Sequence, residues 1–300
     1  MINFSIIIPH RNIPVLLQRC LDSIPVRDDL EVIVVDDNSD EGIVCFEQFP
    51  HWRGDHYSLL LTKEGKGAGY ARNVGLSHAK GKWILFVDAD DFYSEDFPAF
   101  LDKLVDAEED LIIFDHRSVL SSDVSVSVDR SVYLSNLIKD YLAGRIDERM
   151  IRCKFVVVTC KMIRKELLDR YHIRFSDAKW SNDIYFSAQV SCYADKLRVC
   201  PDIISVYTVR DGSLTSDYCG TRKEAIVRLQ EALKCDRLYY KHGLNSRRNF
   251  LSSSLMNTIY QKYGFRWCLK SCVAAFFNQP VFSAMFVFLI KKKYLRFFHR

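Results

Sequence analysis

The sequence predicts an α/β fold with a mostly parallel central sheet and a helical C-terminal extension. Between residues 4 and 114, short continuous apolar runs alternate with segments in which apolar residues recur at helical spacing. The apolar runs end in Pro or in clusters of Asp, Asn and Ser, which favour turns. Residues 222–300 have a largely helical pattern. Continuous apolar strands separated by helices are typical of a parallel sheet that is covered on both faces.

Five apolar runs are predicted to form the strands of this sheet: Phe4–Ile8, Glu31–Val35, Leu59–Leu61, Trp83–Val87 and Leu111–Phe114. Ligands of such sheets bind beyond the carboxyl ends of the strands. Two acidic clusters, residues 36–37 and residues 88–91, directly follow the second and fourth strands. We therefore expect both clusters to lie at the ligand-binding edge of the sheet.

Helices are predicted over residues 15–24 and 70–79, and another begins near Glu95. Residues 115–133 are rich in Ser, Asp and Val without a clear period, which predicts a variable loop or a short extra hairpin. We divide the chain into three regions: residues 1–115, residues 116–220, and a basic, mainly helical region at 221–300. A length of 300 residues allows one large domain or two modest ones.

The charge is unevenly distributed along the chain. Residues 221–300 contain sixteen Lys and Arg against three Asp and Glu, so residues 1–220 carry a net charge of −9 although the whole chain carries +4. A cationic end on an anionic protein favours an acidic partner, either nucleic acid or anionic lipid. The ten cysteines are scattered without a Cys-x-x-Cys pair, and Met1-Ile2-Asn3 leads directly into a strand. We expect reduced thiols, no signal peptide and a cytoplasmic location.

Asp88-Ala89-Asp90-Asp91 is the most specific motif. Carboxylates two residues apart at the end of a strand can hold Mg²⁺ or Mn²⁺ together with diphosphate oxygens, because both ions favour oxygen ligands and share them with the substrate. The alternative is a solvated acidic loop that precedes the helix near Glu95. A haloacid-type phosphatase also uses Asp-x-Asp, but it needs Thr or Val where Phe92 stands, and the motif normally follows the first strand.

Asp36-Asp37-Asn38-Ser39 allows two interpretations. Asx residues favour turns through side-chain to backbone hydrogen bonds, and a carboxylate here could instead accept from a nucleobase or a ribose hydroxyl. Gly65-x-Gly67-x-Gly69-x-x-Arg72 lacks the third glycine of a dinucleotide-binding motif and does not tightly follow a strand, which disfavours NAD. Arg72 is interpreted as a fixed cation beside phosphate or the carboxylates, or as a surface arginine at a helix start.

Together these motifs resemble the inverting glycosyltransferases of family 2, of the bacterial surface-polysaccharide type, which have the GT-A (nucleotide-diphospho-sugar transferase) fold. The resemblance covers roughly residues 3–115 and resumes further along. It rests on Ile6-Ile7-Ile8-Pro9-His10-Arg11-Asn12, Val34-Val35-Asp36-Asp37-Asn38-Ser39, Gly69-x-Ala71-Arg72-Asn73-x-Gly75-Leu76, Phe86-Val87-Asp88-Ala89-Asp90-Asp91, Ile173-Arg174-Phe175, Asn182-Asp183-x-x-Phe186 and Tyr207-x-x-Arg210-x-x-Ser213.

The resemblance implies that residues 1–115 form the nucleotide-sugar-binding half and residues 116–220 the acceptor-binding and catalytic-base half. It also implies a role for each matching position. Asp37 would meet the nucleobase, Asp88 the ribose or diphosphate, and Asp90 the metal with Asp88 and Asp91 nearby. Asp183 would be the general base. Nucleotide-binding positions would also include Pro9, Arg11 and Arg72.

Three positions depart from the family pattern. Asn182 stands where an acidic residue usually precedes the base, and Arg11 stands where the family often has Tyr or Phe on the nucleobase, although a guanidinium can also stack there. Arg210 falls where some members have a metal-binding His. Because Arg cannot ligate a cation, we expect Arg210 to bind diphosphate oxygens.

The C-terminal region combines apolar residues with basic ones. Residues 271–290 contain no charge and are followed by Lys291-Lys292-Lys293, and Asn278-Gln279-Pro280 interrupts the apolar run. A helix pair lying in the interface of an anionic membrane fits this pattern better than a single span. A buried helix packed on the enzyme and a true span remain alternatives. Nucleic acid is disfavoured because no binding motif accompanies the basic residues.

The sequence thus predicts a metal-dependent transferase, peripheral on the inner face of the plasma membrane. With Mn²⁺ or Mg²⁺, it would move one sugar from a nucleoside diphosphate sugar, a UDP-sugar in our interpretation, to a saccharide or lipid-linked acceptor. The anomeric carbon would be inverted, because one carboxylate is enough for a single displacement. The alternative is a degenerate sugar-nucleotide-binding or scaffold protein, which the retention of both Asp90 and Asp183 disfavours.

Overall fold

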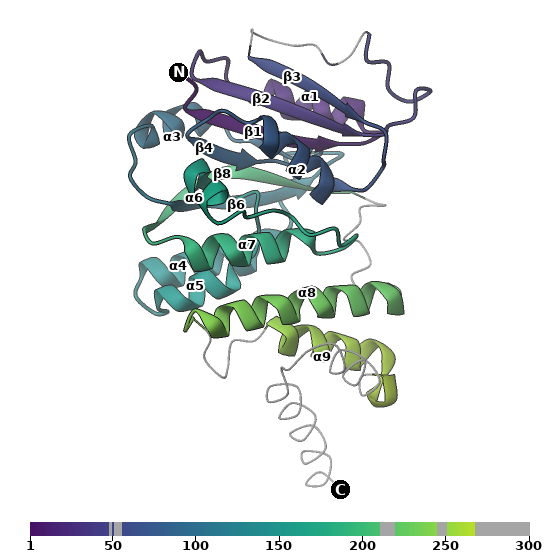
Figure 1. Cartoon of the computed structure of the whole chain (residues 1–300), viewed down its shortest axis with the longest axis vertical. Coiled ribbons are helices and arrows are strands. Elements are labelled where there is room, and N and C mark those ends of the chain that lie inside the picture. The colour runs from purple at the N-terminus through teal and green to yellow at the C-terminus, as the bar shows by residue number, and fades with distance from the viewer. Residues whose placement is uncertain (48–49, 51–55, 211–219, 245–250, 268–300) are drawn as a thin grey trace, which may run out of the picture.

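The computed structural model describes residues 1–47, 50, 56–210, 220–244 and 251–267. Its centre is an eight-stranded sheet in the order β3-β2-β1-β4-β7-β6-β8-β5, shown in Figure 1. The strands are β1 (Phe4–His10), β2 (Leu30–Asp37), β3 (Tyr57–Thr62), β4 (Trp83–Phe86), β5 (Phe92–Tyr93), β6 (Leu111–Leu120), β7 (Lys161–Arg164) and β8 (Leu197–Val209). Strands β3, β2, β1 and β4 are parallel, which confirms the predicted mostly parallel α/β sheet.

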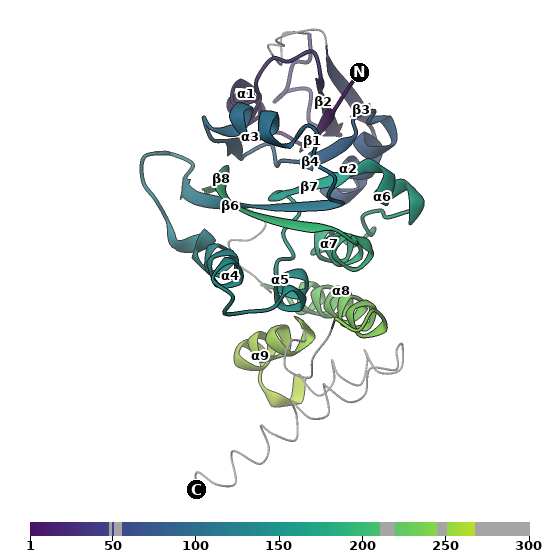
Figure 2. The ribbon, with the colours of Figure 1, turned by 90° about the vertical axis from the view of Figure 1, so that its left-hand side faces the viewer.

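Helices cover both faces of this sheet. Helices α1 (Pro14–Asp22) and α3 (Phe97–Leu104) lie on one side, and α2 (Ala68–His78) and α6 (Lys165–Arg170) lie on the other, as Figure 2 shows. Every residue of β1 and β2 is buried. This burial explains why the two strands have continuous rather than alternating apolar sequences.

Pairing in register brings the carboxyl ends of the central strands together. His10 at the end of β1 pairs with Asp36 of β2, and Ile7 of β1 pairs with Phe86 of β4. The segments that follow β1, β2 and β4 therefore leave the sheet at one edge, where the two acidic clusters were expected.

The second half of the sheet differs in part from the sequence prediction. The fifth predicted strand was expected to end at Phe114, but β6 continues to Leu120, and Val119 forms an isolated antiparallel bridge with Ser127. Residues 115–133, predicted to form a variable loop or a short extra hairpin, are therefore partly strand, and the antiparallel bridge fits the hairpin alternative. The polar side chains of residues 115–118 interrupt the apolar pattern, so the pattern did not predict this part of the strand. Parallel pairing with β8 nevertheless holds it in the sheet.

Besides α6, five helices follow β6 in the described part of the chain: α4 (Val132–Leu142), α5 (Glu148–Lys154), α7 (Asn182–Tyr193), α8 (Arg222–Lys241) and α9 (Leu251–Tyr263), with a short 3₁₀ turn at Asp129–Ser131. Helix α8 lies along α7, and α9 packs on α8, in both views. The α8–α9 contact is apolar and buries Leu229, Leu233, Met256 and Ile259. This pair confirms a helical C-terminal extension as far as residue 267.

Within the described part of the chain, no helix is both long and apolar enough to cross a bilayer. The predicted membrane-binding segment, residues 271–290 with Lys291-Lys292-Lys293, lies outside the described residues.

Candidate active site

The turn after β2 is built by Asp36 and does not leave that carboxylate free. Asp36 Oδ1 accepts from the backbone N–H of Ser39 (2.8 Å), and Oδ2 accepts from the Ser39 hydroxyl (2.6 Å) and lies 2.7 Å from His10 Nδ1. Burial alone would raise the pKa of Asp36, but the hydrogen bonds from His10 and Ser39 hold it below its ordinary value. For Asp36, the turn interpretation of the motif therefore describes the structure.

Asp37 holds the loop between β3 and α2. Its carboxylate accepts from the backbone N–H groups of Lys66 (3.1 Å) and Gly67 (2.6 Å) and from the Thr62 hydroxyl (3.2 Å). The residue is 3% exposed. Asp37 thus lies at the expected edge, where it fixes the start of α2.

Local geometry favours glycine at two positions, one in that loop and one in the first turn of α2. Gly67 has φ +96°, a conformation that L side chains rarely adopt. Gly69 lies against α7, since a Cβ added there would be 2.8 Å from Cγ of Asn182. The glycine-rich motif therefore lets α2 approach the residue that precedes Asp183.

Three carboxylates gather after β4. One oxygen from each of Asp88, Asp90 and Asp91 can be chosen so that all three lie within 4.8 Å of one another. The Asp88 side chain is 41% exposed and that of Asp90 is 23% exposed. Asp91 is buried, and its carboxylate accepts from the backbone N–H of Thr208 (2.8 Å).

Two arginines from distant segments pair with this cluster. Arg72 on α2 donates from NH2 to Asp88 Oδ1 (2.5 Å), and Arg210 after β8 donates from Nε to Asp90 Oδ2 (3.1 Å). Arg72 is 6% exposed and lies 5.3 Å from the ring centre of Phe175. A buried guanidinium held by a ring and a carboxylate is a fixed positive charge.

The cluster still has an excess of negative charge. Burial, followed by repulsion from Asp88, raises the pKa of Asp90, and burial with repulsion from Asp88 and Asp90 raises the pKa of Asp91 well above its ordinary range. Close carboxylate oxygens whose negative charge is only partly neutralised are the donor set that a hard divalent cation prefers. The residues present therefore fit Mg²⁺ or Mn²⁺.

Asp183 lies in the first turn of α7, half-buried. Arg72, which pairs with Asp88, also donates from Nη1 to Oδ1 of Asn182 (3.5 Å), the residue before Asp183. Burial raises the pKa of Asp183, and the positive charge of Arg72 opposes this rise. One arginine thus links the acidic cluster to the start of the helix that carries Asp183, although these segments are far apart in the sequence.

The remaining predicted residues lie around the same edge. Pro9 is buried within β1 and pairs with Val35. Arg11 is exposed, and its guanidinium lies beside Gly65, where an added Cβ would be 3.5 Å from NH1.

Sequence reasoning missed several residues that contact the backbone of the acidic cluster or the helix that carries Asp183. Arg19 on α1 donates to the backbone carbonyl of Asp90 (2.6 Å), and so does the Thr208 hydroxyl (2.7 Å). Lys161 on β7 is fully buried and donates to the Phe155 carbonyl (2.8 Å) and to the hydroxyl of Ser187, one helical turn after Asp183. Burial lowers the pKa of Lys161 to about 7. None of these residues belongs to a local motif, so only their tertiary contacts reveal them.

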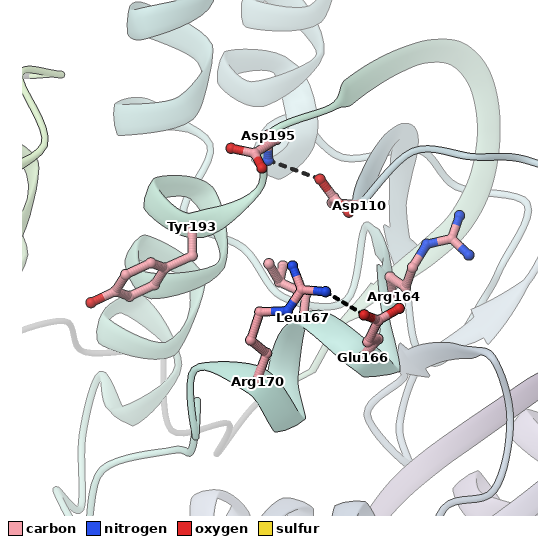
Figure 3. A pocket seen from close by; sticks show the side chains of 7 residues that line it. All are labelled: Asp110, Arg164, Glu166, Leu167, Arg170, Tyr193 and Asp195. Carbon is pink, nitrogen blue, oxygen red and sulfur yellow. Dashed lines mark hydrogen bonds and ion pairs between the residues drawn. The ribbon is translucent and has the colours of Figure 1, made fainter.

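A small polar pocket lies at the other end of the sheet. Figure 3 shows Arg164 and Glu166 lining it together with Asp110, Leu167, Arg170, Tyr193 and Asp195. Arg164 pairs with Trp83 at the beginning of β4, whereas the acidic cluster follows the end of that strand. The pocket is therefore separate from the carboxylates.

Comparisons with known proteins show the family and the fold of this chain. A sequence model described as glycosyl transferase family 2 matches residues 5–172. The glycosyltransferase GlyA of Streptococcus pneumoniae serotype 4 is 27% identical over 235 residues, which are 74% of this chain and 33% of GlyA. The chain thus spans about a third of the length of this curated relative.

Two solved structures share the fold. Staphylococcus aureus TarS 1–349 in complex with UDP-GlcNAc has a TM-score of 0.63 at 20% identity, covering 90% of this chain and 79% of that one. The mannosyltransferase PcManGT of Pyrobaculum calidifontis, in complex with GDP-Man and Mn²⁺, has a TM-score of 0.52 at 18% identity, covering 96% and 85%. At these identities the likeness shows the fold, which confirms the GT-A architecture.

Proposed function

Because the chain belongs to glycosyl transferase family 2, we propose that it transfers one sugar from a nucleoside diphosphate sugar to an acceptor hydroxyl, with inversion at the anomeric carbon. The observation that carries this proposal is the double contact of Arg72. Its guanidinium joins Asp88 of the acidic cluster to Asn182, the residue before Asp183. A donor diphosphate at the cluster would then lie next to a carboxylate that can accept a proton.

The donor we propose is a UDP-sugar. The support is the likeness to TarS, which was solved with UDP-GlcNAc. The nucleoside would lie against the ends of β1 and β2, near Arg11 and Asp37, and the diphosphate would lie near Asp88, Arg72 and Arg210. Arginine is suited to this task because its planar group can give two parallel hydrogen bonds to phosphate oxygens.

Asp88, Asp90 and Asp91 would hold a divalent cation, Mn²⁺ or Mg²⁺. When bound, such an ion neutralises negative charge on a leaving diphosphate. A neighbour solved with Mn²⁺ and the close carboxylate oxygens support this assignment.

In the proposed reaction, Asp183 accepts the proton of the acceptor hydroxyl while the oxygen of that hydroxyl attacks the anomeric carbon. The bond from that carbon to the diphosphate oxygen breaks on the opposite face, so the configuration inverts. Arg72 and Arg210 stabilise the charge that develops on the diphosphate. A raised pKa suits Asp183 to this role, because a general base is most effective when its pKa approaches the working pH.

We propose that the acceptor is a saccharide or a lipid-linked saccharide of a surface polysaccharide. The names of relatives support this class, since TarS is a poly(ribitol-phosphate) β-N-acetylglucosaminyltransferase and another relative is the succinoglycan biosynthesis protein ExoO of Rhizobium meliloti. The site would then face the cytoplasm at the inner surface of the plasma membrane. The basic, apolar residues 271–300 would attach the protein to that anionic surface.

A panel of nucleotide sugars in Mn²⁺ tests the function directly. A ligand that binds only the folded state raises the unfolding temperature, so a UDP-sugar should shift it more than the corresponding GDP-sugar or free sugar. Release of UDP from the stabilising donor should then be measurable. Binding without any release, with or without acceptor, would identify a scaffold protein, and binding of no nucleotide would overturn the proposal.

A further inference from the structure

A buried arginine of α8 contacts the residue that starts the helix of the proposed base. Arg228 donates from NH1 to the hydroxyl of Ser181 (2.8 Å) and from Nε to Glu224 Oε1 (2.7 Å). Arg228 and Glu224 are each 6% exposed. A charged pair removed from water to this extent needs accurate geometry, so its orientation is restricted.

Ser181 has an unusual backbone conformation. It is the N-cap of α7 with φ 58° and ψ 30°, and its side chain makes no capping hydrogen bond to the helix. A serine in the left-handed region costs free energy and persists only where its surroundings hold it. Since Asp183 follows two residues later, the conformation of Ser181 sets the direction in which α7 begins.

The same face of α8 also contacts the beginning of the segment 176–181, which precedes α7. Glu231 Oε2 accepts from the hydroxyl of Ser176 (2.9 Å), and Glu231 is 2% exposed. Glu224, Arg228 and Glu231 are spaced four and three residues apart, which places them on one side of a helix. Residues 176 and 181 are therefore both fixed by α8.

Apolar contacts reinforce this arrangement. Ile184, next to Asp183, packs against the cluster formed by α8 and α9 and against a second cluster that includes Ala188 of α7 and Tyr239 of α8. The start of α7 thus rests on the C-terminal extension, not only on the sheet.

We propose that Arg228 is a positioning residue that orients Asp183 through Ser181, which makes α8 part of the active site. This inference rests on the proposed function, because it takes Asp183 as the general base. A displacement of about 1 Å in a reacting group can cost on the order of 10²-fold in rate. Loss of the Arg228 contact should therefore slow the transfer step without weakening donor binding.

The test compares Arg228→Met, Arg228→Lys, Ser181→Ala and the double variant Arg228→Met/Ser181→Ala. Lys223→Met is the matched control, since Lys223 is an exposed cation on the same helix. For each variant, single-turnover transfer and the Kd for UDP in Mn²⁺ are measured, with the fold checked by circular dichroism. Arg228→Met and Ser181→Ala should each lower the transfer rate about 10- to 100-fold with UDP affinity unchanged. Arg228→Lys should recover part of the loss, and Lys223→Met should have no effect.

The double variant decides whether Arg228 acts through Ser181. If it does, the double variant should be no slower than the slower single variant, whereas independent effects would multiply. The inference would be overturned if the losses multiply. It would also be overturned if Ser181→Ala and Arg228→Lys both transfer sugar within twofold of the wild-type rate. These two milder variants provide the test if Arg228→Met does not fold. Asp183→Asn is measured alongside. If Asp183→Asn still transfers sugar, Asp183 is not the base. If Asp183→Asn is inactive but the Arg228 and Ser181 variants transfer sugar at the wild-type rate, only the positioning role fails.

Discussion

Arg210 Nε lies 3.1 Å from Asp90 Oδ2, so the guanidinium that follows β8 pairs with a carboxylate of the acidic cluster. Together with the pair between Arg72 and Asp88, this contact gives two of the three clustered carboxylates an internal positive partner. A divalent cation that enters the cluster would therefore meet competing guanidinium groups. A donor diphosphate offers those groups an alternative partner.

Asp90→Asn should remove metal-dependent nucleotide binding. A neutral amide replaces a carboxylate beside a divalent ion, and the diphosphate loses the bridge between ion and protein. Calorimetric titration with UDP, in Mn²⁺ and in EDTA, measures this dependence. Unchanged UDP affinity in Mn²⁺, with an intact fold, would falsify the metal role of Asp90.

Arg210→Gln should separate the binding of metal from the binding of nucleotide. Without the guanidinium, Asp90 loses its competing partner, so Mn²⁺ alone should bind more tightly. UDP should bind about 10-fold more weakly or worse, since a hydrogen bond to a charged group contributes roughly 1.5–3 kcal/mol. Both affinities can be measured by titration of the same protein. If both change in the same direction, Arg210 does not exchange partners.

Asp183→Asn should abolish sugar transfer and leave UDP binding nearly unchanged. The amide keeps the size of the side chain but cannot accept the proton of the acceptor. The expected loss is roughly 10²–10⁴-fold in turnover. Because burial raises the pKa of Asp183, wild-type turnover should fall on acidification at a higher pH than an aspartate of ordinary pKa would give. Transfer within about tenfold of wild type would show that another group is the base.

Sequence reasoning predicted β1, β2 and β4 well because every residue of these three strands is buried, whereas β3 at the edge of the sheet is only partly buried. Strands β1, β2, β4 and the beginning of β6 contain continuous apolar runs, and the two acidic clusters directly follow the runs that end at Val35 and Val87. No bounds were predicted for β5, β7 and β8. Strands β7 and β8 carry buried polar residues, such as Lys161 and Ser205, that interrupt the apolar pattern, and both strands pair with strands that are distant in the sequence.

For the candidate site, sequence reasoning identified the residues in local motifs but not those that support them. The motifs named Asp88, Asp90 and Arg72, which the structure brings together. Arg19 and Arg228 lie on amphipathic helices, where an arginine gives no sign of whether it faces solvent or a buried partner. Their contacts depend on tertiary packing, which neither spacing nor composition records.

Truncation after residue 266 should shift the protein from the membrane fraction to the soluble fraction. This removes both the apolar run 271–290 and Lys291-Lys292-Lys293. Lysines near an anionic surface contribute about 1 kcal/mol each, so the three alone bind weakly and apolar residues must supply the rest. Replacing the three lysines by Gln should weaken attachment and reduce its salt sensitivity. Full-length protein that does not float with anionic liposomes at low salt would contradict membrane attachment and favour a helix packed on the enzyme.

His116→Phe should make the protein more resistant to acid. His116 is 2% exposed between Phe155 and Tyr207, and neither ring nitrogen has a hydrogen-bond partner among the described residues. Burial lowers its pKa to about 4 against the opposing effect of Asp115, whereas the unfolded chain binds this proton near its ordinary value of 6.5. Between these values the unfolded state holds the extra proton, so stability falls as the pH drops from 6.5 to 4.

That linkage gives the sign and the size of the effect. At about 1.4 kcal/mol per pKa unit, the wild type should lose about 3 kcal/mol over this range through His116, and the variant should not. Urea unfolding of both proteins at pH 7 and pH 4.5 measures the difference. His78→Phe, at an exposed position on α2, is the control and should follow the wild type. If His116→Phe loses as much stability between the two pH values as the wild type, His116 is not held neutral by its burial.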